Sequence, residues 1–384
     1  MFRADTVSMK ETFSRRTGEN LGEELLAKLG EVPKACWLFC APLDGLSEFV
    51  AGVGDAVSTR DIVGCTTDGE ISGSGYSTGS AVLAGIATDK IDFHVTSVTG
   101  VGANSEEAGR KLAERLPSTV TYAQVFSDGL TGNGCAILRG IASVLGPETP
   151  VAGGTAGDSG RFQRTWQFVG DRVESDAAVA IGFSGDFQVG TGVRSGWSPL
   201  GVAKKATRAS GNILFELNHQ PALEVYERFL GKHADKLPEV GVEYPLGLVD
   251  EAAQTGEEFL LRATMSVNRD DGSIAFAGEI PEGAMVRLTC GDYHCILEAA
   301  KEAARMALAD LADVEPVMAF FFTCMARKIV LGRRTREEVA ILKQVFGPRL
   351  PIIGFYTYGE YCRVRRGGPS LLHNETATIS VIGV

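Results

Sequence analysis

Three short segments combine a threonine, a glycine and an acid at one spacing, and such side chains could bind a polar ligand. The segments are Thr67-Asp68-Gly69-Glu70, Thr155-Ala156-Gly157-Asp158 and Thr357-Tyr358-Gly359-Glu360. The apolar residues before each segment predict a short strand, so the hydroxyl and the carboxylate follow a strand end. A carboxylate in that place could bind a ligand ammonium, while the glycine lets another backbone approach closely. The alternative is structural, with both side chains bonding the amides of their own turn.

A fourth polar segment, Ser127-Asp128-Gly129-Leu130, lies between a predicted strand and a predicted helix. Free amides at the N-terminus of a helix attract a carboxylate or a phosphate, so Asp128 and its neighbours are candidates for a ligand site. A tightly packed turn is the alternative. The segment lacks the Gly-Lys-Ser/Thr ending of a nucleotide P-loop, and ATP binding is not expected.

The same elements precede each of the three glycine motifs, which indicates an internal repeat. Each motif follows an apolar strand, a helical pattern and a second short strand: 36–40 and 46–57, then 122–126 and 135–145, then 317–323 and 337–346. Further back, strands at 81–87 and 91–98 with a helix at 105–116 resemble strands at 260–267 and 284–289 with a helix at 292–311. We therefore expect an α/β protein of two homologous halves, forming a multi-layer sandwich of mixed sheets covered by helices.

Composition limits the classes of function. The chain has 384 residues, enough for two domains, and 44% of them are hydrophobic, as in globular proteins. A net charge of −11 disfavours binding to nucleic acids and to anionic membranes. No apolar run is long enough to span a membrane and no secretory signal is visible, so we expect a cytoplasmic protein with its eight cysteines reduced.

Catalytic motifs are not expected to operate in this chain. Gly75-Tyr76-Ser77-Thr78-Gly79 fits the G-x-S-x-G pattern, yet that nucleophile elbow needs a strand before it and a helix after it. Here a glycine-rich turn comes before the pattern and a predicted strand follows. Because no HExxH, DFG or strand-linked GxGxxG motif is present either, we expect a binding protein and not an enzyme.

A series of motifs in fixed order gives the chain a family resemblance. The motifs are Gly64–Glu70, Ser127–Leu130, Val151–Thr155, Gly196–Gly201, Leu217–Tyr226, Thr323–Arg327 with Leu331-Gly332, Gly354–Glu360 and His373–Thr376. Together, over about residues 30–384, they resemble the FIST family, first its N-terminal and then its C-terminal domain. The resemblance implies an N-terminal extension at 1–30, a FIST N domain at 31–218 and a FIST C domain at 219–384.

The resemblance also implies a function. FIST domains are intracellular sensors in signal transduction that are thought to bind small ligands such as amino acids. It implies ligand contacts from the motif residues already named and from Arg327 and Tyr356, which lie in matching motifs. The expected partners are a small molecule and a signalling protein such as a histidine kinase, and a homodimer is left open.

A FIST chain with no output domain attached also resembles the NosP type, which binds haem and senses nitric oxide in two-component signalling. Haem needs an axial ligand such as histidine in an apolar pocket. His294, in the first turn of the helix predicted at 292–311, is the first candidate because a positive helix end keeps an imidazole neutral. His373 and His219 follow it, and His219 stands where the family usually has glycine. Packing or surface exposure is the alternative for each histidine, and an amino acid or another metabolite is the alternative ligand.

Overall fold

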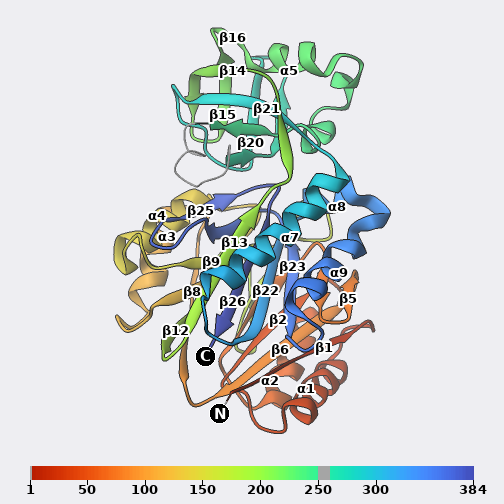
Figure 1. Ribbon diagram of the computed structural model, residues 1–384, viewed down its shortest axis with the longest axis vertical. Coiled ribbons are helices and arrows are strands. Elements are labelled where there is room, and N and C mark those ends of the chain that lie inside the picture. Colours follow the sequence, from red (N-terminus) through yellow and green to blue (C-terminus); the bar gives the residue numbers. More distant parts are fainter. Residues whose placement is uncertain (1, 250–259) are drawn as a thin grey trace.

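The computed structural model describes residues 2–249 and 260–384. Three six-stranded mixed sheets form the body of the molecule, and a smaller lobe stands at one end of it (Figure 1). None of the helices in the described ranges is both long and apolar enough to cross a membrane.

The body consists of three copies of one unit, strand–helix–strand–helix–strand–hairpin–strand. Repeat 1 (residues 2–88) contains β1 (Phe2–Met9), α1 (Arg15–Leu29), β2 (Ala35–Cys40), α2 (Leu46–Val57), β3 (Ile62–Thr66), the hairpin β4 (Glu70–Ser72) and β5 (Gly75–Ser77), and β6 (Ala81–Thr88). Repeat 2 (residues 91–185) contains β7 (Ile91–Thr99), α3 (Ser105–Glu114), β8 (Tyr122–Ser127), α4 (Gly134–Leu145), β9 (Val151–Thr155), β10 (Gln167–Val169), β11 (Arg172–Glu174) and β12 (Ala177–Gly185).

Repeat 3 (residues 188–194 and 293–383) is interrupted by the lobe. It contains β13 (Gln188–Arg194), α7 (Tyr293–Asp310), β22 (Pro316–Cys324), α8 (Met325–Leu331), the 3-10 helix η3 (Gly332–Arg334), α9 (Thr335–Phe346), β23 (Ile352–Thr357), β24 (Glu360–Arg363), β25 (Ser370–His373) and β26 (Ala377–Gly383). The repetition expected from the glycine motifs is thus present, and its unit is smaller than half of the chain. Residues 2–29, expected to be an extension, supply the first strand and helix of repeat 1.

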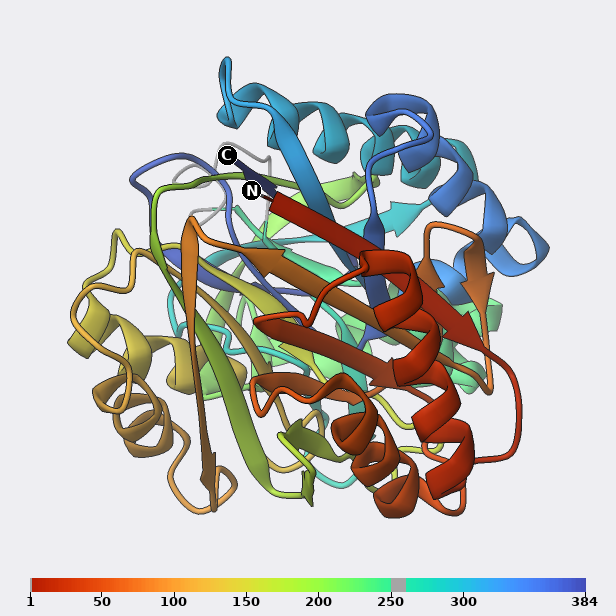
Figure 2. The same cartoon turned by 90° about the horizontal axis from the view of Figure 1, so that it is seen from below.

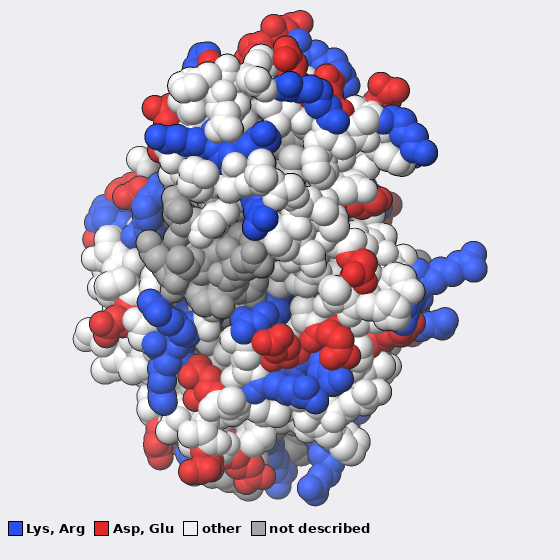
Figure 3. Space-filling model, turned by 45° about the horizontal axis from the view of Figure 1, so that its top comes forward, with Lys and Arg blue, Asp and Glu red and all other residues white. Residues whose placement is uncertain are grey.

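The lobe (residues 197–291) has a small core of its own around Tyr226 and Phe276. It contains β14 (Trp197–Ser210), β15 (Ile213–Leu217), β16 (Gln220–Pro221), α5 (Ala222–Leu230), the 3-10 helices η1 (Gly231–Lys236) and η2 (Glu239–Val242), β17 (Leu246–Leu248), β18 (Leu260–Arg262), β19 (Thr264–Asn268), β20 (Ser273–Phe276) and β21 (Met285–Gly291). Acidic and basic side chains are interspersed on the face of lobe and body seen in Figure 3, with no broad area of one sign.

The three sheets have equivalent strand orders, and the hairpins exchange between them. The orders are β1-β6-β2-β3-β10-β11, β7-β12-β8-β9-β24-β25 and β13-β26-β22-β23-β4-β5. In each, the central strands are parallel: β2 with β3, β8 with β9, and β22 with β23. The hairpin of repeat 1 completes the sheet of repeat 3, that of repeat 2 completes the sheet of repeat 1, and that of repeat 3 completes the sheet of repeat 2. This exchange links the repeats into a closed ring.

The inner faces of the sheets enclose one aromatic core, and the helices cover the outer faces. Phe39, Phe126 and Phe322 hold the same place in the three repeats, with ring centroids 5.1–6.2 Å apart. Figure 2 shows the helix pairs around the outside, α1 with α2, α3 with α4, and α7 with α9. Each pair packs on its own sheet through a separate apolar cluster. The predicted α/β class, with mixed sheets covered by helices, is confirmed.

Candidate functional site

A glycine in the second parallel strand of each repeat fixes which residues correspond. An added Cβ at Gly64, Gly153 or Gly354 would lie only 1.7–2.1 Å from a carbonyl oxygen of the neighbouring strand, that of Leu38, Val125 or Phe321. Only glycine allows the two backbones to approach so closely. Gly64, Gly153 and Gly354 therefore occupy equivalent positions in the three repeats, and residues at the same distance after them correspond.

The three bends bond one another in a ring at the carboxyl ends of the parallel strands. The Asp68 N–H donates to the Tyr356 carbonyl at 2.9 Å, and the Gly157 N–H donates to the Thr66 carbonyl at 2.9 Å. The Tyr358 N–H completes the ring by donating to the Thr155 carbonyl at 3.4 Å. Asp68, Gly157 and Tyr358 each stand four residues after the strand glycine, so the ring has threefold symmetry. The three bends thus meet at one place, and phenylalanine rings fill the space between the sheets beneath them.

Counting from the strand glycine shows that only two of the three threonine–acid pairs are equivalent. Thr67 and Thr357 lie three residues after their glycines, whereas Thr155 lies two residues after Gly153. The apparent third copy of the motif is thus displaced by one residue. Its contacts differ accordingly: the Thr155 hydroxyl is buried and has no hydrogen-bond partner among the residues that the structure describes.

The two equivalent pairs are buried and hold their bends together. Thr67 Oγ1 donates to Glu70 Oε1 at 2.5 Å, and Glu70 Oε2 accepts from the backbone and the hydroxyl of Ser80 at 3.1 and 2.5 Å. In repeat 3, Thr357 donates to Glu360, whose Oε2 accepts from the backbone and the hydroxyl of Thr376 at 3.2 and 2.8 Å. These contacts are those of the structural alternative.

Burial raises the pKa of Glu70 and of Glu360 to about 7 from an ordinary 4.5, although their hydroxyl partners lower it in part. Between those values the folded protein binds more protons than the unfolded chain. The free energy of unfolding should therefore fall as pH rises from about 4.5 to about 7, by up to about 1.4 kcal/mol per pH unit for each carboxyl. Urea denaturation at several pH values measures this slope.

The variant Glu70→Gln has no carboxyl group that titrates at this position. Its free energy of unfolding should therefore fall less steeply with pH over the same window than that of the wild type. Glu224, an exposed acid of the lobe, provides the control, and Glu224→Gln should keep the wild-type slope. Equal slopes in the wild type and Glu70→Gln would contradict the assignment.

Asp68 is the bend residue whose carboxylate keeps an open acceptor. The residue is only 2% exposed, and its Oδ1 accepts no hydrogen bond from the described part of the chain. Its Oδ2 forms an ion pair with Lys328 of α8, and that ammonium also donates to the Asp68 carbonyl. Burial raises the pKa of the Asp68 carboxyl, and the ammonium offsets part of the rise. Lys328 is 21% exposed, so this pair lies at the edge of the solvent.

The loop at 158–164 forms the side of this site, and Asp158 organises it. The Asp158 carboxylate accepts the N–H groups of the four residues 161–164 at 2.7–3.1 Å and the hydroxyl of Tyr358. Burial tends to raise the pKa of Asp158, but these hydrogen bonds hold it below its ordinary value overall. An added Cβ at Gly160 would lie 3.5 Å from Asp68 Oδ1, so the loop passes beside the open acceptor.

An aromatic pair adjoins the same loop. The ring of Phe162 stacks on that of Tyr358 at 4.7 Å, and Phe162 remains 48% exposed. We call the group Asp68, Asp158, Phe162, Lys328 and Tyr358 the mouth. It combines a buried carboxylate that has one unbonded oxygen, a mostly buried ammonium at the edge of the solvent and an aromatic face, which suits a small ligand that carries both charges.

The other predicted ligand residues have internal partners. Asp128 accepts the N–H groups of Leu130, Thr131 and Asp176 at 2.8, 3.0 and 3.1 Å, so it organises its own turn. The side chains of Arg327 and Tyr356 bond Glu338 in the interior, and the Tyr356 ring lies 5.9 Å from the Lys328 ammonium, so it forms the inner wall of the mouth.

The three predicted haem ligands lie in unlike surroundings. His294 is exposed at the start of α7 beside Tyr293, with ring centroids 4.1 Å apart. His373 is buried with Nε2 3.0 Å from the Cys362 carbonyl oxygen, and burial lowers its pKa to about 4. His219 is exposed in a turn of the lobe at φ 62°. Across 2–249 and 260–384, no cluster of three or more His, Cys, Asp or Glu side chains could hold a metal ion.

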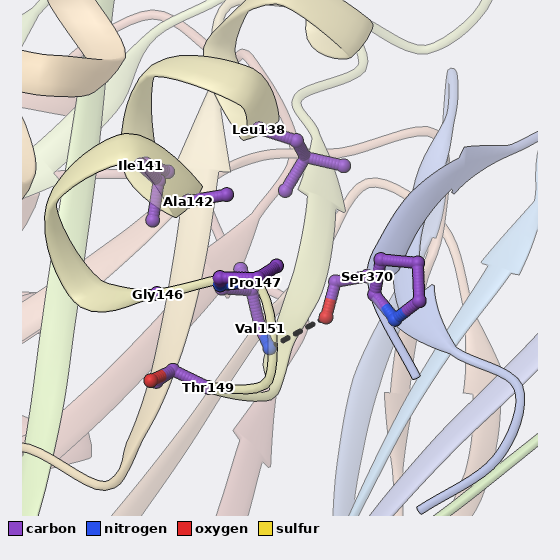
Figure 4. A pocket seen from close by; sticks show the side chains of 9 residues that line it. Leu138, Ile141, Ala142, Gly146, Pro147, Thr149, Val151 and Ser370 are labelled. Atoms are coloured by element: carbon purple, nitrogen blue, oxygen red, sulfur yellow. Dashed lines mark hydrogen bonds between the residues drawn. The ribbon is translucent and has the colours of Figure 1, made fainter. Parts of the chain in front are cut away.

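One small cavity lies away from the mouth, between α4 and β25 (Figure 4). It has a volume of about 20 Å³ and is lined mainly by apolar side chains, among them Leu138 and Ile141. The Ser370 hydroxyl in its lining accepts the Val151 N–H at 2.8 Å. Space for about one water molecule does not suit a metabolite.

Sequence reasoning missed Lys328, Phe162, Asp68 and Tyr358 as site residues. Asp68 and Tyr358 occupy the variable position between threonine and glycine in their motifs. A charged or an aromatic residue at that position could have indicated a ligand contact. Lys328 directly follows the predicted Arg327, but 260 positions separate it from Asp68.

Comparisons with known proteins agree with the motif order. The family model described as the FIST N domain matches residues 7–220, and the FIST C domain model matches residues 222–363. An uncharacterized protein of Methanocaldococcus jannaschii is 24% identical over 372 residues, which cover 90% of this chain and 69% of that protein.

Solved structures resemble the chain only distantly. Cyanuric acid hydrolase from A. caulinodans covers 100% of this chain and 99% of its own at 9% identity, with a TM-score of 0.40. A chorismatase covers 99% of this chain and 98% of its own at 8% identity, with a TM-score of 0.31. Similarity at this level carries no argument about activity.

Proposed function

Because the chain belongs to the FIST family, whose domains sense small ligands in signal transduction, we propose that it binds a zwitterionic metabolite such as an amino acid at the mouth. The observation that carries the proposal is the buried Asp68 carboxylate, one oxygen of which accepts no hydrogen bond from residues 2–249 or 260–384 and lies beside the ammonium of Lys328. A buried carboxylate oxygen without a partner is costly, and a ligand that satisfies it gains that free energy.

Each charge of such a ligand has a counterpart in the mouth. A ligand ammonium would donate to Asp68 Oδ1, and a ligand carboxylate would accept from Lys328, which is already at the edge of the solvent. The Asp158 carboxylate is occupied by its own loop and by Tyr358, so it shapes the site and does not bind the ligand. The exposed ring of Phe162 offers an apolar contact to a ligand side chain.

Haem does not fit the described histidines as a ligand set. An axial histidine needs an apolar pocket in front of its ring. His294 and His219 are exposed, and the ring of His373 is enclosed and lies against a backbone carbonyl. We therefore derive no step from haem or nitric oxide, and we favour the metabolite alternative.

Sensing further requires a partner that responds to the bound state. We infer that the chain binds its ligand without converting it, in keeping with a family of sensors. A ligand shifts a conformational equilibrium only as far as its affinity differs between the two states. A signalling protein such as a histidine kinase, or a second copy of the chain, would read that shift.

Thermal-shift measurements with the standard amino acids test this proposal. A ligand at a hundred times its Kd should stabilise the native state by about 2.7 kcal/mol and raise the melting temperature. The N-acetyl derivative of an active amino acid should give no shift, because it lacks the ammonium that pairs with Asp68. Asp68→Asn should abolish the shift, because the amide carries no charge.

Asp310 supplies a matched control, since its carboxylate also pairs with a basic side chain, Arg363, at 3.1 Å but lies outside the mouth. Asp310→Asn should keep the ligand-induced shift. A wild-type protein that responds to no amino acid, or an Asp68→Asn variant that responds as strongly as the wild type, would remove the proposal.

A further inference from the structure

We infer that α8 couples the mouth to the lobe, so that a ligand at the mouth changes how firmly the lobe is attached to the body. The inference rests on the proposed function for the identity of the signal. Two adjacent residues of this short helix carry it: Lys328 belongs to the mouth and bonds Asp68, and Arg327 contacts both connections to the lobe.

Arg327 holds the two points at which the chain crosses between body and lobe. Its side chain is fully buried, and it donates to the carbonyl of Ser195, just before β14, and to that of Ile296, in the first turn of α7, the latter at 2.8 Å. The chain leaves the body at the first of these residues and has just returned to it at the second. One guanidinium therefore fastens both crossings.

The crossings also pack directly on each other, so they respond together. An added Cβ at Gly196 would lie 2.6 Å from the Cys295 carbonyl oxygen, and one at Gly291 would lie 2.6 Å from the indole of Trp197. The outgoing and the returning segment are thus packed too closely at these glycines to move past each other. A displacement of either one is passed to the other.

Other described polar contacts between lobe and body lie away from the crossings. Glu279 of the lobe pairs with Arg139 of α4 at 2.7 Å and accepts from Asn133 at 3.0 Å, at a partly exposed surface. Partly exposed ion pairs of this kind hold little free energy. The buried Arg262 donates to the Leu372 carbonyl at 3.2 Å, and the Ala263 N–H donates to Asn374 Oδ1 at 3.4 Å. The lobe is thus fastened at its crossings through Arg327 and meets the body again through these contacts.

Lys328 connects Arg327 and the two crossings to the ligand site. Its ammonium bonds the side chain and the carbonyl of Asp68, which belongs to repeat 1, while its neighbour Arg327 is fixed within repeat 3. Successive residues of one helical turn move as a unit, because the backbone between them is rigid. A ligand carboxylate that competes with Asp68 for Lys328 therefore displaces the helical turn that also carries Arg327.

Hydrogen–deuterium exchange on the full chain tests this coupling without any ligand. Lys328→Met removes the contact with Asp68 and leaves Arg327 in place. Exchange of the amides in residues 195–200 and 291–297 should rise about tenfold in this variant, because local opening at the crossings becomes easier. Lys301→Met is the matched control: Lys301 is partly buried on α7, near one crossing, and forms an ion pair with Glu298 at 3.2 Å on the same helix. It should leave exchange at both crossings unchanged.

The outcomes separate this inference from the proposed function. Wild-type protection of the crossings in Lys328→Met, or a rise confined to residues 325–331, would overturn the coupling even if amino acids bind. A tenfold rise at both crossings in Lys328→Met but not in Lys301→Met supports the coupling, even if no amino acid binds and the ligand class must be revised. Asp68→Asn, which removes the side-chain half of the same contact, should raise exchange at the crossings to a smaller extent.

Discussion

Replacing Arg327 by methionine should lower the free energy of unfolding by about 3–5 kcal/mol. The guanidinium is wholly buried and meets the wholly buried Glu338 carboxylate at 2.7–2.8 Å. Methionine fills much of the volume but leaves that carboxylate without its cation, and it removes the guanidinium donor from the carbonyls of Ser195 and Ile296. An uncompensated buried charge is far more costly than the loss of a surface ion pair. Urea denaturation of the wild type and the variant measures the difference.

Arg363 provides the matched comparison, because it is also a buried arginine of repeat 3. It pairs with the less buried Asp310 and donates to the Val189 carbonyl, so solvent can partly compensate the acid that Arg363→Met leaves behind. Its loss of stability should be the smaller one. Combining Arg327→Met with Glu338→Leu should recover part of the loss of stability. The recovery is incomplete because the Tyr356 hydroxyl then loses the Glu338 carboxylate to which it donates at 2.6 Å. A loss below about 1 kcal/mol for Arg327→Met alone would show that the pair is not a structural clamp.

Local signals in the sequence predicted the elements well. The helix expected at 46–57 is α2 with the same bounds, and the one expected at 292–311 is α7, Tyr293–Asp310, because Asp292 caps it by accepting the N–H groups of His294 and Cys295. The helix expected at 135–145 is α4, Gly134–Leu145, which Asn133 caps by accepting the Ala136 N–H. These features depend on neighbouring residues, and periodicity and capping residues report on them directly.

The arrangement of the repeats could not be predicted in the same way. The exchange of hairpins pairs β4 with β23, and β24 with β9, across more than 200 residues. No local pattern carries that information. The one-residue displacement of Thr155 was equally hidden, because the motif alone aligns Thr155 with Thr67, and only the contact of Gly153 with the Val125 carbonyl shows the true correspondence.

The candidate site residues also separate into those that a sequence pattern indicated and those that it did not. Glu70 and Glu360 were recognisable as a repeated pattern, yet repetition reflects what the fold needs in every copy, and both acids proved to hold bends. A ligand with one positive and one negative charge has no threefold symmetry, so the site proposed for it departs from the repeat. At the equivalent bend positions stand Asp68, Gly157 and Tyr358, and these differences between copies give the mouth its chemistry. For the proposed site, variation within the repeated motif is therefore the more informative signal.

Gly64→Ala should be the most damaging methyl group that can be added to repeat 1, with a loss of roughly 3 kcal/mol or more, at the upper end of what overpacking costs. Its Cβ would lie 1.7 Å from the Leu38 carbonyl oxygen, a backbone atom that cannot turn aside, so β2 and β3 would have to separate. The ring of bonds begins two residues later at Thr66, so the variant should also weaken ligand-induced stabilisation at the mouth.

Gly54→Ala separates that effect from the general effect of a glycine replacement. Gly54 lies in α2 of the same repeat, and an added Cβ there meets nothing closer than 3.7 Å. Alanine favours a helix over glycine by about 0.5–1 kcal/mol, so this variant should be at least as stable as the wild type. Urea denaturation of both variants gives the comparison. If Gly64→Ala matched Gly54→Ala in stability, the parallel strands would not be held at the distance that brings the three bends into one ring, and the mouth would lose its physical basis.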